Sequence, residues 1–310
     1  MDAFATRPTI PEWRAFWSRL LHGAGLGSLG AGLVFFVAAN WPAWGLAGRF
    51  GLLQAGLLAC VGAALWRPPP GRPGQAALLI AILFTGALLA LFGQSYQTGA
   101  DLYELFLAWA ALALPFAVAA QWGAAWAAWW VVLDAGLALL CGVASLDRAL
   151  FALFDGWLRD RGLPLMLACG ANLLGAGLFV VLRRSRFAAA AAPPWLARFL
   201  LGIGLIFGTA ASLPGWGREE FLGIVAYAAL SAGIAWSAWR RRSDVFALTA
   251  LAGSWIAISA AWLARSIRTD EVGSLFTVAV WPIVSSTLSA TWLLRCARAW
   301  RGDAVEGGVR

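Results

Sequence analysis

The sequence contains no lysine, a single histidine and few charged residues of any kind. All 23 basic side chains among its 310 residues are arginines, and charged residues make up 12% of the chain. That share is about half the charged fraction of a soluble domain. The lack of lysine excludes a Walker-type phosphate loop and Schiff-base chemistry, because both require an amine. His22 alone argues against histidine-based catalytic pairs and histidine-rich metal sites.

Cysteine is equally scarce, and its four copies show no pattern of metal ligation. They fall singly inside or at the end of apolar runs, as Cys60, Cys141, Cys169 and Cys296. None has the spacing of zinc ligands, and thiols in apolar surroundings are inert. We therefore interpret them as small core-filling side chains, and we expect neither a metal nor a cofactor.

What the sequence has in abundance is apolar residues, which make up 61% of the chain. Runs long enough to cross a bilayer as helices predict an all-α, polytopic transmembrane bundle. Ten spans are predicted, at about 23–40, 50–66, 75–92, 102–120, 123–143, 163–182, 199–213, 221–239, 244–263 and 275–294. The run at 199–213 is short and ends in Leu213-Pro214-Gly215, so a broken or re-entrant helix there would leave nine spans.

The distribution of arginine predicts the orientation of these spans. With ten spans, 16 arginines fall on the side of the two termini and 7 on the other side. The positive-inside rule then places both termini in the cytoplasm of a bacterial inner membrane. The net charge of +8 is mostly this topology signal. The lipid bilayer is therefore the expected partner, and no nucleic acid is expected.

The chain divides into four predicted segments. Residues 1–22 form a cytoplasmic segment in which Trp13, Phe16 and Trp17 recur at helical spacing, typical of an amphipathic helix on the membrane surface. A signal peptide with a weak cleavage site at 37–39 is the competing interpretation. Residues 23–145 and 146–296 form two transmembrane halves in a possible 5 + 5 arrangement, and 297–310 form a polar cytoplasmic tail. The connection 183–198, with Ala188 to Ala192 before two prolines, is interpreted as a linker.

Asp134 is the sharpest candidate for a functional residue. It lies near the middle of the span at 123–143, where a carboxylate costs about 2.5–3.5 kcal/mol on insertion scales. The functional hypothesis is a proton-coupling or cation-coupling site. The structural alternative is a neutral carboxyl that bonds a neighbouring helix, for example through Asn172, Gln54 or a hydroxyl group.

A second polar cluster joins the spans at 75–92 and 102–120 on the predicted external side. Its candidate residues are Gln94, Tyr96, Asp101, Tyr103 and Glu104. Asn40 and Trp41, and the segment around Arg218, should emerge on the same side. Together these residues predict an outward-facing pocket with aromatic walls. The alternative is helix capping, because Asp101 and Glu104 have the three-residue spacing of a capping box.

Short motifs in the first half are typical of one family. Ala38-Ala39-Asn40-Trp41, then Gly93-Gln94-Ser95-Tyr96, then Trp109 to Leu114-Pro115 follow one another in order. Over about residues 10–145, the chain resembles a bacterial family of multi-pass membrane proteins catalogued only as a domain of unknown function. The resemblance implies a bacterial inner-membrane location and no particular reaction.

Small residues inside the spans predict close helix packing, with Gly23 and Gly27, and Gly204 and Gly208, as two examples. Three hypotheses for function follow. The first is a carrier for a small molecule or lipid that uses Asp134. The second is a membrane-embedded scaffold or sensor subunit that binds another membrane protein and has no substrate of its own. The third is an intramembrane enzyme acting on a lipid-linked substrate, with Asp101 and Glu104 as acid and base.

Overall fold

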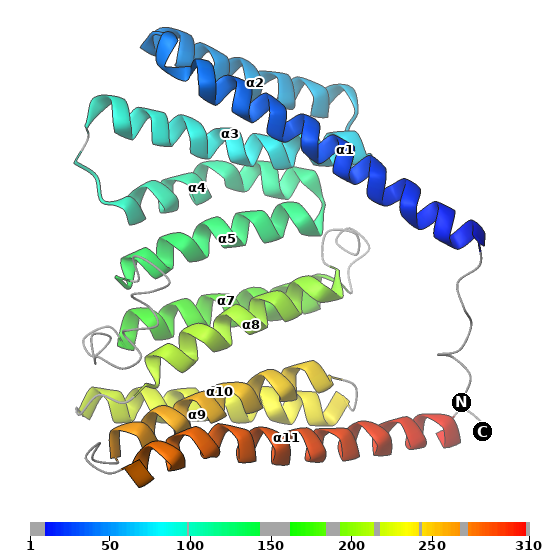
Figure 1. Ribbon diagram of the computed structural model, residues 1–310, viewed down its shortest axis with the longest axis vertical. Helices are drawn as coiled ribbons and strands as arrows, with labels where there is room; N and C mark the ends of the chain where they lie inside the picture. The colour runs from blue at the N-terminus through cyan, green and yellow to red at the C-terminus, as the bar shows by residue number, and fades with distance from the viewer. Residues whose placement is uncertain are drawn as a thin grey trace. The chain divides into compact units, whose positions relative to one another are not determined.

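The computed structural model describes residues 10–97, 99–142, 162–183, 193–213, 218–241, 244–266 and 272–307. These residues form ten α-helices and one short 3-10 helix, and no strand is present among them. Figure 1 colours the helices by their order in the chain, from blue for α1 to red for α11. The predicted all-α class is confirmed, and each predicted span coincides with one helix.

Seven of the ten helices are long and apolar enough to cross a membrane. They are α2 (Leu46–Trp66), α3 (Arg72–Tyr96), α4 (Leu102–Ala120), α5 (Gly123–Leu140), α7 (Gly162–Leu182), α8 (Pro194–Ala211) and α10 (Val245–Ser266). The remaining three predicted spans lie in α1 (Ile10–Asn40), α9 (Arg218–Arg241) and α11 (Val272–Gly307). The protein is thus a multi-helix membrane protein, and the count of ten spans stays a prediction.

The chain forms two compact units, Met1–Ala55 and Gly56–Arg310. In the first unit, α1 is one uninterrupted helix of 31 residues. At 1.5 Å per residue it is about 46 Å long, whereas the hydrocarbon core of a bilayer is about 30 Å thick. The predicted amphipathic segment and the first predicted span therefore form a single helix, on which Trp13, Phe16 and Trp17 are exposed and contact one another.

A short turn follows α1 in the first unit and is held by an arginine. The turn contains the 3-10 helix η1 (Trp41–Ala43), whose first turn holds Pro42. Arg49 on α2 donates from Nε to the carbonyls of Trp41 at 3.1 Å and Trp44 at 2.9 Å. Its guanidinium lies 5.4 Å from the centroid of the Trp41 ring. Arg49 therefore closes the turn between α1 and α2.

In the second unit, successive helices pack against one another, and α7 with α8 share the most extensive contact. Tryptophan side chains link neighbouring helices. Trp109 on α4 donates from Nε1 to the carbonyl of Ile82 on α3 at 2.7 Å, and Trp129 on α5 donates to Ala110 on α4 at 2.7 Å. The indoles of Trp109 and Trp129 therefore join neighbouring helices. Tryptophans at helix ends have a different role, because they favour the interface between membrane and water.

Helix α8 differs from the prediction. It is continuous over 18 residues from Pro194 to Ala211, and it is one of the seven candidate spans. The alternative of a broken helix at 199–213 therefore does not hold, and the helix begins earlier than the predicted span, at Pro194, because proline is favoured in the first turn of a helix. The alanine run at 188–192 of the predicted linker lies outside the described residues.

Glycines allow the close packing of α8 as predicted. A Cβ at Gly204 would lie 3.2 Å from the Asn172 Cβ on α7. A Cβ at Gly208 would overlap the Tyr227 ring on α9 and lie 3.0 Å from the Cys169 Sγ on α7. Gly23 and Gly27 belong to α1, and the structure does not describe their surroundings. For α8, the small-residue packing predicted from the sequence is confirmed.

Candidate functional site

Asp134 lies inside the second unit, on the face of α5 that packs against α7. The side chain is only 7% exposed, although it is surrounded by helices that are long and apolar enough to cross a membrane. The sequence pattern of α5 explains this placement. Trp130 and Asp134 are both buried and, being four residues apart, share one face of α5. The buried Gly136 instead lies on the other side, against Phe106 and Leu107 of α4.

Asn172 on α7 is the hydrogen-bond partner of Asp134. Its Nδ2 donates to Asp134 Oδ1 at 2.7 Å and to the carbonyl of Ala168, one turn earlier on α7, at 3.1 Å. Asn172 is fully buried. The pair therefore joins α5 to α7 at the point where the sequence named Asn172 as a possible partner.

Three buried polar atoms around this pair have no hydrogen-bond partner within the described part of the chain. They are Asp134 Oδ2, Asn172 Oδ1 and Trp130 Nε1. An unpaired polar atom in an apolar interior costs about 1–3 kcal/mol. Two of the three are acceptors, so a proton or another cation brought to the pair would remove part of this cost. We call Asp134, Asn172 and Trp130 the α5–α7 polar cluster.

The packing around the cluster leaves little freedom for the indole of Trp130. A Cβ at Gly175 on α7 would lie 2.5 Å from Trp130 Cζ2. The Trp130 ring also contacts the ring of Trp129 edge to face, with centroids 5.3 Å apart. Gly175 therefore lets α7 approach α5 closely enough for Asn172 to reach the carboxyl.

The predicted external cluster lies at the junction of α3 and α4. Gln94 and Tyr96 are exposed near the end of α3, and the Tyr96 ring packs on Phe92 with centroids 4.8 Å apart. The chain leaves α3 through Gln97 and Gly99, both at positive φ. The structure therefore brings Gln94 and Tyr96 to one helix end, and their role in ligand binding stays a prediction.

The two carboxylates of this segment begin α4. Asp101 occupies the N-cap position with an extended backbone, but its side chain makes no capping hydrogen bond. Glu104 lies in the first turn, where a negative charge favours the helix, and it accepts a 3.4 Å hydrogen bond from the Tyr103 hydroxyl. The geometry thus matches the start of a helix, without the side-chain bond of a complete capping box.

The other predicted site residues are distributed over both units. Asn40 ends α1 and Trp41 begins η1, so both belong to the first unit. Arg218 is the first residue of α9 in the second unit, and its side chain lies outside the described residues. The single outward-facing pocket expected from these residues therefore stays a prediction.

A hydroxyl cluster that the sequence reasoning missed lies between α8, α9 and α10. Tyr227, which is fully buried, hydrogen-bonds through its hydroxyl to Ser254. Ser254 Oγ is 2.7 Å from Thr209 Oγ1, which donates to the Leu205 carbonyl at 2.6 Å. One direction therefore satisfies all three groups: Tyr227 donates to Ser254, and Ser254 donates to Thr209. Single hydroxyls in apolar runs are common, so only the spatial convergence distinguishes these.

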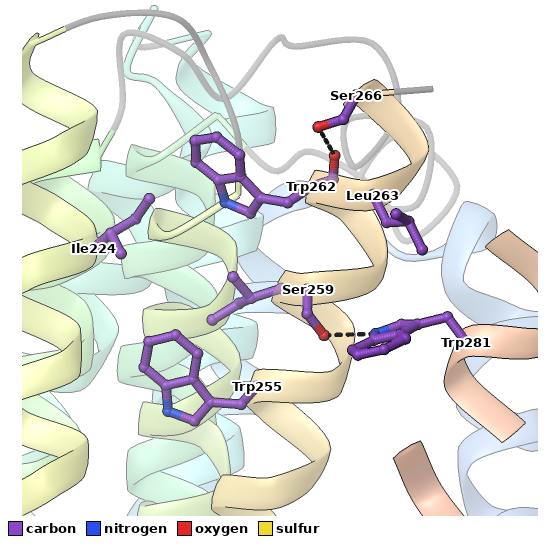
Figure 2. A pocket seen from close by; sticks show the side chains of 8 residues that line it. Ile224, Trp255, Ser259, Trp262, Leu263, Ser266 and Trp281 are labelled. Atoms are coloured by element: carbon purple, nitrogen blue, oxygen red, sulfur yellow. Dashed lines mark hydrogen bonds between the residues drawn. The ribbon is translucent and has the colours of Figure 1, made fainter. Parts of the chain in front are cut away.

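A pocket that the sequence reasoning also missed lies between α9, α10 and α11. Its cavity volume is about 530 Å³. Figure 2 shows Trp255 and Trp262 of α10 and Ile224 of α9 along one wall, with Trp281 of α11 bonded to Ser259 on the other side. We call this cavity the tryptophan pocket. Six of its eight lining residues lie on α10 between Trp255 and Ser266, and the pocket forms only because Ile224 of α9 and Trp281 of α11 pack beside them.

The cysteines take no part in a metal site within the described residues, where no group of three metal-ligating side chains occurs. Cys141 and Cys169 are buried in an apolar core cluster, and none of the four cysteines, all of which the structure describes, forms a disulfide. The core-filling role is therefore confirmed for these two. Cys60 and Cys296 are partly exposed.

A comparison with protein families decides the resemblance seen in the sequence. Residues 4–126 match the family model described as predicted membrane protein (DUF2157). The predicted likeness to a membrane-protein family of unknown function is confirmed. The DUF2157 match contains Asn40, Trp41 and the α3–α4 junction, and it ends before Asp134. No curated protein and no solved structure matches the chain.

Proposed function

We propose that this membrane protein is a proton-coupled carrier for a small molecule or a lipid, and that Asp134 is the residue that takes up and releases the proton. One observation carries the proposal: a carboxyl that is 7% exposed between candidate membrane spans, with one oxygen bonded to Asn172 and the other without a donor. Ionisable residues inside membrane segments commonly form proton relays and substrate pathways.

The electrostatics of the cluster favour a proton over a permanent counter-ion. The one ion pair among the described residues joins Arg198 to Asp244, away from Asp134. An ionised Asp134 would therefore be a buried charge paired only with an amide, which is costly. Protonation removes that charge and gives Oδ2 a hydrogen to donate. Asp134 can therefore exchange between an ionised and a protonated form, and a carrier needs such a two-state group to couple proton movement to transport.

Infrared difference spectroscopy tests the protonation step directly. Purified protein in lipid is cycled between mildly acidic and alkaline buffer, and the signal of the protonated carboxyl is recorded. We expect a band that disappears in Asp134→Asn and persists in Glu104→Gln, which removes an exposed carboxyl. A band unchanged by Asp134→Asn, or an Asp134 band that never changes with pH, would contradict the proposal.

Transport is tested in everted membrane vesicles that hold a proton gradient reported by a fluorescent dye. A panel of amphipathic cations, organic acids and lysolipids is added to vesicles with the unmodified protein or Asp134→Asn. We expect at least one compound to dissipate the gradient only with the unmodified protein. Equal dissipation with Asp134→Asn would remove this residue from the mechanism. Asparagine has a volume and polarity similar to those of aspartate, so we expect Asp134→Asn to fold. Gel filtration of the purified variant checks this.

The hydrogen bond between Asn172 and Asp134 also supports the second hypothesis, in which the protein is a membrane-embedded scaffold. A buried polar pair between α5 and α7 can serve to specify helix register, which is an attested use of such groups. In that case the Asp134 carboxyl stays protonated at every pH, and the protein co-purifies from native membranes with a second membrane protein. Crosslinking in those membranes, followed by mass spectrometry, separates the two hypotheses.

A further inference from the structure

The tryptophan pocket has walls that offer almost nothing to a polar ligand. Ser259 donates to the Ile256 carbonyl at 3.0 Å and accepts a 2.9 Å hydrogen bond from Trp281 Nε1. Ser266 donates to the Trp262 carbonyl at 2.8 Å. The hydroxyl protons and the Trp281 indole proton are thus used inside the protein (Figure 2). A polar ligand would lose its water without gaining bonds from these groups, which is unfavourable.

Position and size both favour a hydrocarbon chain as the occupant. The candidate span of α10 covers Val245–Ala264, so Trp255, Ser259 and Trp262 lie within it. The cavity of about 530 Å³ is in the range of about 300–1,000 Å³ that ligand pockets occupy. Trp262 and Trp281 remain 36% and 42% exposed, so the pocket reaches the surface of the helices. Where α10 crosses the membrane as a span, the solvent around this part of the helix is lipid.

We propose that the tryptophan pocket binds one acyl chain of a phospholipid. The chain contacts the indole rings of Trp255 and Trp262, which line the pocket. The site lies on α9, α10 and α11, and it is independent of the protonation proposed for Asp134.

Photo-crosslinking tests the acyl-chain site. The full-length protein in nanodiscs is illuminated with phosphatidylglycerol that carries a diazirine on one acyl chain, and labelled peptides are identified by mass spectrometry. We expect labelling of residues 255–266 to exceed that of the exposed face of α11 around Leu288. Equal labelling of the two segments would show ordinary contact with bulk lipid and would overturn the proposal.

Matched variants locate the site. Leu263→Trp fills the pocket, whereas Leu288→Trp adds the same side chain at a position on α11 that is 64% exposed and does not line it. We expect labelling of 255–266 to fall about tenfold in Leu263→Trp, equivalent to about 1.4 kcal/mol of binding free energy, and to stay unchanged in Leu288→Trp. Ile224→Trp fills the pocket from α9 and replaces Leu263→Trp if that variant does not fold. Unchanged labelling in a folded filling variant contradicts the site.

Asp134→Asn is expected to leave all labelling unchanged, which keeps this test separate from that of the carrier.

Discussion

At the scale of single residues, Asp134 and Asn172 depend on each other. Asn172 is fully buried and places one amide proton on the carboxyl, so each side chain reduces the cost of burying the other. Their sequence positions are 38 apart. The sequence identified Asp134 because an acidic residue in an apolar run is conspicuous, and it named Asn172 as one of several partners. Only the packing of α5 on α7 selected that partner.

We expect this mutual dependence to appear in a double-mutant cycle. Asn172→Leu should lower the free energy of unfolding by about 1–3 kcal/mol, because it leaves the carboxyl without its donor. The double variant Asp134→Leu/Asn172→Leu should cost less than the sum of its two single variants, by about 0.5–3 kcal/mol. Unfolding in detergent, followed by tryptophan fluorescence, measures each step. Additive effects would show that the pair is not energetically coupled.

At the scale of elements, the helices of the second unit are joined by glycines and indoles. Gly175 admits the Trp130 ring, and Gly208 admits the Tyr227 ring. A small residue on one helix thus accommodates a large aromatic residue on the next. Because these contacts set the distance between helices, they also decide whether Asn172 reaches Asp134.

A matched pair of glycines on α7 tests this packing. We expect Gly175→Ala to destabilise the protein by about 1–3 kcal/mol, because its Cβ would lie 2.5 Å from Trp130 Cζ2. Gly177→Ala, two residues later, has no atom within 4 Å of the added Cβ. It should be neutral or stabilise the helix by up to about 1 kcal/mol. Thermal unfolding of both variants under identical conditions measures the difference, and equal shifts would refute the packing argument.

At the scale of the whole molecule, each described α-helix overlaps one of the predicted apolar runs, although α1, α8 and α11 begin or end well outside theirs. Apolar runs that cannot remain in water must form helices when they enter lipid, because every backbone polar group then needs an internal partner. This reason is local to each run, so the ten helices were predictable from the sequence. The orientation rests on arginine counts alone and is not visible in the fold.

Cysteine accessibility tests the predicted orientation. In a variant whose native cysteines are replaced by alanine, Ala100→Cys lies at the α3–α4 junction and Gly71→Cys at the α2–α3 junction. We expect an impermeant maleimide added to intact cells to label Ala100→Cys and to spare Gly71→Cys until the cells are opened. The reverse pattern would place the termini outside, against the positive-inside rule.

The sequence alone determined the all-helical class, the membrane environment, the approximate helix boundaries and the position of Asp134. Each follows from composition and hydropathy, which act within about twenty consecutive residues. The tertiary structure decided what the sequence could not. It selected Asn172 as the partner of Asp134, brought Tyr227, Ser254 and Thr209 together, and formed the tryptophan pocket from three helices. These features depend on contacts between residues far apart in the chain, and such contacts exist only after the helices have packed.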